Sequence, residues 1–399
     1  MFRRLVSRNS DLSRLVERGY AVAFDSKCLI VRDIPYLDED GALQWGAIVA
    51  KLIYVDEERV VQDDHQIYFA GSHPHQLDGT KVPNLAGGEM TIHLSEACND
   101  VVVQRSFSNK PKATGKFADF FDKIESYVAI LSGPAIEKFS VSPLTFRSVE
   151  TDDTDPVFKF QDTLTSRAQI GDLNAGFANE VVAVIGLGGT GGYLLDMLVK
   201  CPIPEIRGFD GDNFYVHNAF RSPGRLDATE LGKTKAEVHQ GRYENFRYGL
   251  KLATTYIDQS SAEALTGVTF AFVCVDKGSA RSAIFDLLIE LGIPFIDVGM
   301  GLKRKEGPIS GMLRVTYYSK QDAATMRARH LAEMSDTPDN LYKANIQIAE
   351  LNAMNACLAL VRYKQLLGFY VEDEPILHLL FGIRDLSITS ETTFDEDQS

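Results

Sequence analysis

The apolar and polar positions of the chain follow different patterns on either side of residue 150. In the first part, short apolar runs are bounded by glycine, proline and aspartate, which is typical of β-strands. A longer stretch, 116–131, repeats its apolar residues at three- and four-residue spacing and predicts a helix. We therefore expect a mixed α+β domain over residues 1–150. Its expected strands are 20–24, 28–31, 48–55, 66–69 and 101–105.

A polar, acidic and turn-prone stretch, 150–156, predicts a linker. Beyond it, strand-like runs alternate with helical patterns, which is typical of a parallel sheet with right-handed crossovers. We expect an α/β domain with a mostly parallel sheet over residues 165–370, followed by a C-terminal extension and acidic tail over 371–399. The expected strands are 181–185, 205–210, 252–256, 270–275, 295–298 and, at the sheet edge, 313–318; the expected helices are 191–200, 233–245, 261–265, 279–291 and 345–368.

The first strand of the α/β domain ends in a cluster of five glycines. Residues 181–192 read Val-Val-Ala-Val-Ile-Gly-Leu-Gly-Gly-Thr-Gly-Gly, which predicts a strand, a tight turn and the start of a helix. Gly186 allows the turn, and Gly188 and Gly189 let backbone N–H groups approach phosphate oxygens. The pattern predicts a nucleotide cradle, although alone it is more typical of dinucleotide or S-adenosylmethionine folds than of adenylation.

Two carboxylates follow strands whose carboxyl ends face the ligand side of such a sheet. Asp210 lies 24 residues after Gly186, near the expected spacing for a carboxylate that binds ribose hydroxyls. Asp276 ends the strand 270–275 and is placed to bind Mg²⁺, which takes one or two carboxylates together with phosphate oxygens. Asp276 is equally suited to cap the following helix, and the two roles are compatible.

Amide and basic side chains accompany these carboxylates. Asn218 and Arg221 lie just past the strand that ends at Asp210, and Lys235 opens the next helix behind Gly232. Arg221 offers planar donors for phosphate oxygens, and Lys235 is expected to reach an α- or β-phosphate. Taken singly, Arg221 is as well explained by a surface ion pair and Lys235 by a solvated helix lysine. Together with a magnesium carboxylate they favour nucleotidyl transfer over hydride transfer.

In order and spacing, these motifs resemble those of the ThiF/MoeB and ubiquitin-activating enzyme superfamily of adenylyltransferases over residues 165–370. The resemblance implies a Rossmann-like adenylation domain, ATP and Mg²⁺ as cofactors, and adenylation of the C-terminal carboxylate of a ubiquitin-like protein. It implies catalytic roles for Arg221, Lys235 and Asp276. The matching residues are Gly186, Gly188, Gly189 and Gly191, then Asp210 and Asp212, Asn218 and Arg221, Lys233 and Lys235, and Asp276 with Arg281.

The resemblance also implies a homodimer in which an N-terminal arginine reaches the partner's triphosphate. Ser166-Arg167-Ala168-Gln169 resembles that element with one residue inserted, which makes Arg167 a candidate catalytic residue. The part before the linker resembles an uncharacterised domain fused ahead of ThiF-like domains in bacterial ubiquitin-like operons. The hypothesis for this domain is docking of a partner protein.

Three departures from the family pattern bear on the later steps. Lys277 stands where the family has asparagine, Ser222 stands where it has glutamine, and the chain has neither zinc-binding Cys-x-x-Cys pairs nor a cysteine in the loop 319–342. The protein therefore adenylates only, passes the acyl group directly to a downstream conjugating partner, or uses a hydroxyl with His330 as base. The hydroxyl candidates in the loop are Ser319, Thr325, Ser335 and Thr337.

The composition of the chain restricts the classes of molecule that we expect it to bind. The net charge of −14 makes nucleic acid or anionic lipid an unexpected partner, and no stretch approaches the ~18 apolar residues of a transmembrane helix. Five unpaired cysteines indicate reduced thiols, so we expect a cytoplasmic protein. Two alternatives remain: a sulfur-carrier-protein adenylyltransferase of the thiamin or molybdopterin type, and a catalytically degenerate binding subunit.

Overall fold

The computed structural model divides the chain into two compact units, Met1–Asp172 and Leu173–Ser399. The expected linker 150–156 and the acidic tail from residue 394 lie outside the described residues. Each unit has its own apolar core. The structure describes residues 2–25, 27–56, 58–95, 98–111, 114–149, 157–160, 162–168, 170–304, 306–336 and 346–392, without the side chains of Arg3, Arg4, Ser166 and Arg167.

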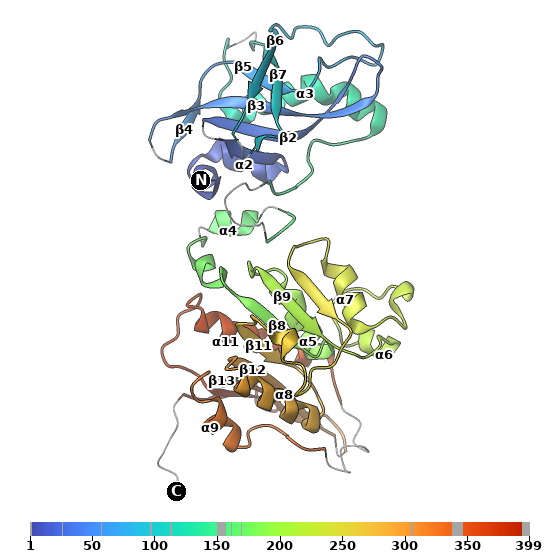
Figure 1. The fold of residues 1–399 in the computed structure, drawn as a ribbon, viewed down its shortest axis with the longest axis vertical. Helices are drawn as coiled ribbons and strands as arrows, with labels where there is room; N and C mark the ends of the chain where they lie inside the picture. The colour runs from blue at the N-terminus through green and yellow to red at the C-terminus, as the bar shows by residue number, and fades with distance from the viewer. Residues whose placement is uncertain are drawn as a thin grey trace. The chain divides into compact units, whose positions relative to one another are not determined.

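The first unit is built on a seven-stranded antiparallel sheet with the order β1-β2-β3-β5-β7-β6, and β4 pairs with β3 (Figure 1). Each strand expected from the sequence corresponds to a strand of this sheet. A bulge between Val31 and Ile34 interrupts the pairing of β2 with β3. The strands are β1 (Ala21–Asp25), β2 (Cys28–Leu37), β3 (Leu43–Tyr54), β4 (Val60–Gln62), β5 (Gln66–Ala70), β6 (Glu89–His93) and β7 (Val102–Ser108).

The helices of the first unit are α1 (Phe2–Arg8), α2 (Ser10–Arg18), α3 (Phe120–Phe139) and α4 (Thr163–Ala168). α3 begins at Phe120 because the Asp119 carboxylate accepts the N–H of Asp122, as an N-cap does. It includes Pro134 and ends eight residues beyond the expected limit of 131. The sequence patterns did not predict α1 or α2, and both pack residues into the apolar core under the sheet.

The second unit contains an eight-stranded sheet with the order β10-β9-β8-β11-β12-β13-β14-β15 (Figure 1). The five strands from β10 to β12 pair in parallel, and β13 to β15 continue the sheet in antiparallel pairs. This confirms the expected α/β class and mostly parallel core. The strands are β8 (Val181–Ile185), β9 (Glu205–Phe209), β10 (Leu250–Ala253), β11 (Phe270–Val273), β12 (Phe295–Lys303), β13 (Ser310–Tyr318), β14 (His378–Gly382) and β15 (Ile388–Glu391).

Helices cover both faces of this sheet (Figure 1). One face packs against α5, α7 and α11, and the other packs against α8 and α9. The strand order reverses between β8 and β11, and in open α/β sheets ligands bind at the carboxyl ends of the strands at such a point. The helices are α5 (Gly189–Leu198), α6 (Val216–Ala219), α7 (Lys235–Tyr243), α8 (Gly278–Glu290), α9 (Ala323–Ala328) and α11 (Ala349–Leu366).

The region expected to be a C-terminal extension is partly integrated into the sheet. β14 pairs with β13 from Met312 to Thr316, and β15 pairs with β14. β14 is only five residues long and does not alternate, and its partner lies some 65 residues earlier in the chain, so it gave little local signal. Among the described residues, we find no helix with the length and apolar content needed to cross a membrane.

Candidate functional site

The glycine loop between β8 and α5 depends on the absence of side chains. Gly186 has φ +95°, and a Cβ there would lie 2.8 Å from the carbonyl oxygen of Cys274, the residue that follows β11. A Cβ on Gly191 would lie 1.9 Å from the carbonyl oxygen of Gly186, and one on Gly189 would lie 2.4 Å from Nδ2 of Asn352. These three glycines are therefore required by the packing of the loop itself.

Gly188 differs from the other glycines of the loop. A Cβ built on it meets no protein atom within 4 Å, so the space in front of this residue is open. Gly188 is the N-cap of α5, and no side chain caps that helix. An uncapped helix N-terminus with open space before it favours a phosphate, because the N–H groups and the helix dipole both attract negative charge.

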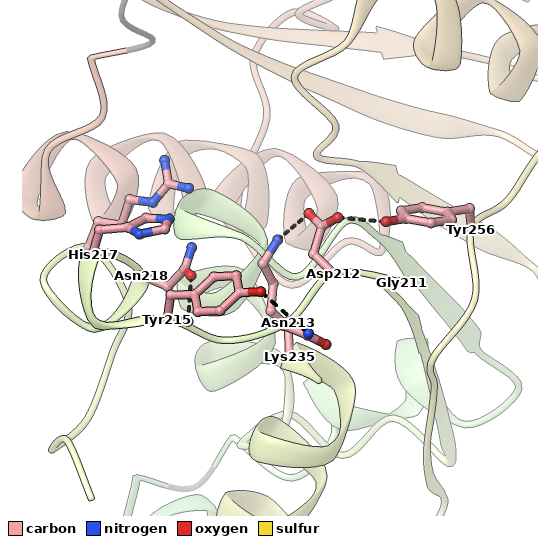
Figure 2. Close-up of a pocket in the computed structure, with 9 residues that line it drawn as sticks. Gly211, Asp212, Asn213, Tyr215, His217, Asn218, Lys235 and Tyr256 are labelled. Atoms are coloured by element: carbon pink, nitrogen blue, oxygen red, sulfur yellow. Dashed lines mark hydrogen bonds and ion pairs between the residues drawn. The ribbon is translucent and has the colours of Figure 1, made fainter. Parts of the chain in front are cut away.

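A cavity of about 410 Å³ lies at the same end of the sheet (Figure 2). Its volume is within the ordinary range for small-molecule sites. Its walls come from the loop after β9, from α6, from the first residue of α7 and from the loop after β10. The lining residues are Gly211, Asp212, Asn213, Tyr215, His217, Asn218, Arg221, Lys235 and Tyr256. The cavity thus unites four of the expected site residues: Asp212, Asn218, Arg221 and Lys235.

The carboxylate of Asp212 is held from two sides. Lys235 Nζ lies 2.7 Å from Oδ2, and the Tyr256 hydroxyl donates to Oδ1 at 2.6 Å (Figure 2). Partial burial raises the pKa of Asp212, but the two hydrogen bonds and the Lys235 charge outweigh it and lower the pKa below its usual value. Asp212 is therefore an ionised acceptor whose side chain is still 55% exposed.

Asp210 lies at the end of β9, as expected, and is buried beside the glycine loop. Its side chain is 7% exposed, and its oxygens accept the backbone N–H groups of Leu187 and Asp212 at 2.8 and 2.9 Å. Lys235 Nζ lies 3.4 Å from both oxygens. Asp210 therefore joins the glycine loop to the end of β9 and does not line the cavity. The expected role of Asp210 as a ribose ligand stays a prediction.

Arg221 is the cation of the cavity with the greatest unused capacity for hydrogen bonds. Its Nε is buried and, among the described residues, has no hydrogen-bond partner. Burial lowers the pKa of its guanidinium, and the charges of Asp276 and Asp212 oppose that shift. A buried donor next to open space fits an anionic ligand.

Asp276 lies just beyond the carboxyl end of β11 and is exposed. Its charge opposes the lowering of the pKa of Arg221, so the two charged groups are near enough to interact. Arg281 fixes this strand end from below, because it donates to the carbonyl of Val275 and to the buried Asp297. The carboxylates of Asp276 and Asp212 are hard oxygen ligands of the kind that Mg²⁺ takes alongside phosphate oxygens.

Asn218 lines the cavity as expected, whereas the side chain of Arg167 is outside the described part of the chain. Asn218 Oδ1 accepts the Tyr215 N–H at 2.8 Å, so its side-chain NH₂ is the group available to a ligand. Arg167 belongs to α4 in the first unit, but its side chain lies outside the described residues. Its expected role beside a partner's triphosphate stays a prediction.

Sequence reasoning missed five residues of the cavity: Gly211, Asn213, Tyr215, His217 and Tyr256. Tyr215 and His217 stack on each other with ring centroids 5.9 Å apart. The sequence pattern extended the third strand to residue 256, whereas β10 ends at Ala253. Tyr256 therefore lies on the loop beyond the strand, at the edge where the functional residues gather. Tyr256 was the last residue of the expected strand 252–256, and its place at that carboxyl end was the signal that could have identified it.

We expect a pH dependence of stability from His239, which lies under the glycine loop with its Nε2 3.3 Å from the carbonyl oxygen of Leu187. Burial, aided by the charge of Arg242, lowers its pKa from 6.5 to about 4. The unfolded chain therefore binds a proton that the folded chain does not as pH falls from about 6.5 to 4. Stability contributed by the neutral ring, about 3 kcal/mol, is present above pH 6.5 and lost across that window.

The measurement is urea unfolding of the second unit at pH 7 and pH 4.5, compared between the wild type and His239→Phe. The variant should lose less stability on acidification than the wild type. His217→Gln, which changes an exposed histidine, should keep the wild-type dependence. Equal pH dependence in the wild type and His239→Phe would contradict the assignment.

Comparisons with known proteins match both units. A family model described as "ThiF family" matches residues 172–386, and one described as "Domain of unknown function (DUF6791)" matches residues 10–163. Ubiquitin-like modifier-activating enzyme 5 of Drosophila willistoni is 28% identical over 148 residues, which cover 34% of this chain and 36% of that protein. The Xenopus laevis enzyme of the same name is 26% identical over 191 residues, covering 45% of each.

The chain thus spans less than half the length of these curated relatives. Among solved structures, E. coli MccB with succinimide is similar with a TM-score of 0.44 and 17% identity, covering 55% of this chain and 66% of that one. A structure of E. coli MccB with ATP has a TM-score of 0.41 and 17% identity, covering 55% and 65%. A structure of PaaA has a TM-score of 0.42 and 20% identity, covering 56% and 76%.

Proposed function

Because the chain belongs to the ThiF family over residues 172–386, we propose that it is an ATP-dependent adenylyltransferase. Its substrate in this proposal is the C-terminal carboxylate of a ubiquitin-like protein, and its reaction is the first step of a bacterial ubiquitin-like conjugation pathway. The relatives named ubiquitin-like modifier-activating enzyme 5 support this substrate class.

The observation that carries the proposal is the combination of groups at one edge of the sheet. An ionised Asp212, the cations Arg221 and Lys235 and the amide of Asn218 line one cavity. The open N-terminus of α5 lies at the carboxyl end of β8, and Asp276 lies at that of β11. Carboxylate, amide and cation groups together suit ribose hydroxyls and a polyphosphate. Hydride transfer would need no such concentration of cations.

The reaction is a displacement at phosphorus. A carboxylate oxygen of the substrate protein attacks the α-phosphorus of ATP, the bond to pyrophosphate breaks, and an acyl adenylate and pyrophosphate result. No proton is transferred, so the protein needs no general base. The contribution of Arg221, Lys235 and the α5 N–H groups is to bind the phosphates and to stabilise the negative charge that moves onto pyrophosphate. Asp210, at the end of β9, binds the ribose in this proposal.

Lys235 has a double role in this account. It is 9% exposed and already paired with Asp212 and Asp210. It therefore holds both carboxylates in place, and its remaining N–H donor is the one available to phosphate. Asp276 would hold Mg²⁺ bound to the nucleotide, and that ion would neutralise part of the phosphate charge.

The cysteines favour transfer of the acyl group to a partner rather than to a thiol of this chain. The thiols of Cys274 and Cys201 lie in the interior of the second unit, and burial raises the pKa of each. Cys28 and Cys98 also have a raised pKa, mainly through burial. Cys357 is exposed on α11, with its Sγ 3.6 Å from Sδ of Met197. A thiolate is the reactive form, so the buried thiols are poor nucleophiles.

The hydroxyl candidates gain little support from their surroundings. Ser319 donates to Asp322 and accepts its N–H at 2.9 Å, as a residue at the start of α9 does. Thr325 is exposed on α9, and Thr337 lies outside the described residues. We therefore favour direct transfer to a downstream conjugating partner over an oxyester.

The proposal extends to assembly and location. We propose a cytoplasmic homodimer, in which Arg167 of one copy reaches the triphosphate of the other. Three exposed side chains beside the cavity, Tyr215, Val216 and Phe220, support an interface at α6, and Phe220 is 80% exposed. For the first unit we propose docking of the ubiquitin-like protein or of the partner.

The experiment is ATP–pyrophosphate exchange with the full chain and a panel of purified ubiquitin-like proteins that end in Gly-Gly. Exchange only in the presence of one such protein would support the proposal. Exchange with a thiamin- or molybdopterin-type sulfur carrier alone would favour the first alternative. ATP binding without exchange for any carrier would favour a degenerate binding subunit, and the absence of ATP binding would contradict the nucleotide site.

A further inference from the structure

We propose that Asn352 of α11 is a positioning residue for the phosphates of the nucleotide, acting through Thr190 and the glycine loop. This inference rests on the proposed function, because it concerns the loop that is to bind those phosphates. Neither the helical pattern of 345–368 nor the family motifs singled out this residue. Its side chain approaches the glycine loop from α11, which begins at Ala349 and packs beside α5.

The amide of Asn352 is in direct contact with the first turn of α5. Its Oδ1 accepts a hydrogen bond of 2.8 Å from the hydroxyl of Thr190. A Cβ built on Gly189 would lie 2.4–2.7 Å from three atoms of the amide, so the amide lies against the backbone of Gly189 and leaves no room for a side chain there. Asn352 therefore fixes both residues from the side of the loop that faces α11.

The residues that Asn352 holds carry N–H groups that the helix itself does not use. Gly188 is the N-cap of α5, and the first hydrogen bond of the helix runs from the N–H of Gly192 to the carbonyl of Gly188. The N–H groups of Gly189, Thr190 and Gly191 precede that bond and have no partner within the helix. A phosphate in the open space before Gly188 would accept hydrogen bonds from them. The direction of these donors depends on the position of the first turn.

Packing alone does not account for an amide at position 352. Asn352 is 1% exposed, and its Nδ2 is buried and has no hydrogen-bond partner in the described part of the chain. A buried donor without a partner carries a desolvation cost that an apolar side chain of the same size would avoid. The hydrogen bond that the amide does form is the one from Thr190. We therefore expect its contribution to lie in the geometry of the glycine loop rather than in stability.

A second asparagine, Asn355, offers a matched comparison. It lies three positions further along α11, so the two side chains share one face of the helix. It is 0% exposed, and its Oδ1 also has no partner among the described residues. Its Nδ2, however, donates at 3.0 Å to the carbonyl of Gly299 on β12 and not to the glycine loop. The two asparagines therefore differ in the segment that they hold and not in burial or residue type.

The test is isothermal titration calorimetry of the full chain with ATP and Mg²⁺, for the wild type, Asn352→Ala, Thr190→Val and the double variant. We expect the ATP dissociation constant to rise about tenfold in each single variant, because the N–H groups of α5 lose their fixed direction. The double variant should bind at most about twofold more weakly than either single variant, because both changes break the same hydrogen bond. Asn355→Ala should change the dissociation constant less than about twofold, because it leaves the glycine loop in place.

Equal losses of ATP affinity in Asn352→Ala and Asn355→Ala would assign the effect to helix packing and overturn the positioning role, as would an unchanged affinity in Asn352→Ala. Losses that multiply in the double variant would overturn the route through Thr190. In these cases the wild type still binds ATP, so the proposed function stands. A wild type that does not bind ATP would contradict the proposed function and this inference with it. If Asn352→Ala does not fold, Thr190→Val decides, because valine keeps the shape of threonine and removes only the hydroxyl.

Discussion

Replacing Asp276 with alanine is expected to reduce ATP–pyrophosphate exchange by about a hundredfold or more. Asp276 is exposed beyond the end of β11, and its charge acts on Arg221 of the cavity. In the proposed reaction its carboxylate anchors the cation that accompanies the triphosphate. Its loss leaves charge on the reacting phosphates without compensation. Exchange should be measured with the carrier protein that supports it in the wild type, at saturating ATP and Mg²⁺.

Two variants control for a structural effect. Glu290→Ala removes an exposed carboxylate from the far end of α8, the helix that follows Asp276, and should exchange at the wild-type rate. Asp276→Asn preserves the shape of the side chain but removes its charge, so its exchange rate should fall as far as that of the alanine variant. The N-cap of α8 is Lys277, not Asp276 as the sequence allowed. Near-normal exchange in Asp276→Ala would show that the metal ligand is misassigned.

Replacing Gly191 with alanine is expected to lower the free energy of unfolding of the second unit by about 4 kcal/mol or more. The added methyl group would lie 1.9 Å from the carbonyl oxygen of Gly186, so the glycine loop and the start of α5 would have to move apart. The neighbours on both sides are backbone or buried side chains and leave no room for adjustment. Urea unfolding monitored by circular dichroism measures the loss.

Gly188→Ala is the matched variant, because the same methyl group there meets open space. Its φ of −72° suits alanine, so we expect a stability within about 1 kcal/mol of the wild type. The methyl group would nevertheless stand where phosphate oxygens approach the N–H groups, and ATP affinity should fall at least about tenfold. A stable Gly188→Ala that binds ATP normally would contradict the phosphate cradle.

The sequence predicted the part of the site that follows from strand ends. A run of β-branched residues that stops at glycines determines where β8 ends, and parallel strands bring their carboxyl ends to one edge. That reasoning correctly grouped Asp212, Asn218, Arg221 and Lys235 in one cavity. It needed only the order of strands and helices, which local patterns encode.

Local sequence patterns do not predict the different surroundings of Asp210 and Asp212. The two residues are separated by one glycine, and their roles depend on which backbone N–H groups remain unpaired above β9. In the structure, the Asp210 carboxylate accepts two of those N–H groups, and the Asp212 side chain lines the cavity. The same limit applies to Tyr256, which lines the cavity because β10 ends three residues earlier than the pattern indicated.

The missed elements share a physical cause. α2 buries Leu12, Leu15 and Val16 on one face but has only nine residues, and helices this short are stabilised mainly by tertiary packing. β14 gains its hydrogen bonds from β13, a distant part of the chain. Both elements are short, and they depend on packing against or pairing with other parts of the chain.

Oxygen-18 transfer tests the central claim, that a carboxylate attacks the α-phosphorus of ATP at this cavity. A Gly-Gly-ended carrier protein that supports exchange is prepared with ¹⁸O in its C-terminal carboxylate and incubated with the full chain, ATP and Mg²⁺, and hydroxylamine then releases the acyl group. The account predicts AMP that carries one ¹⁸O atom by mass spectrometry, with no label in Asp276→Ala. Unlabelled AMP, or ADP formed together with labelled orthophosphate, would contradict it.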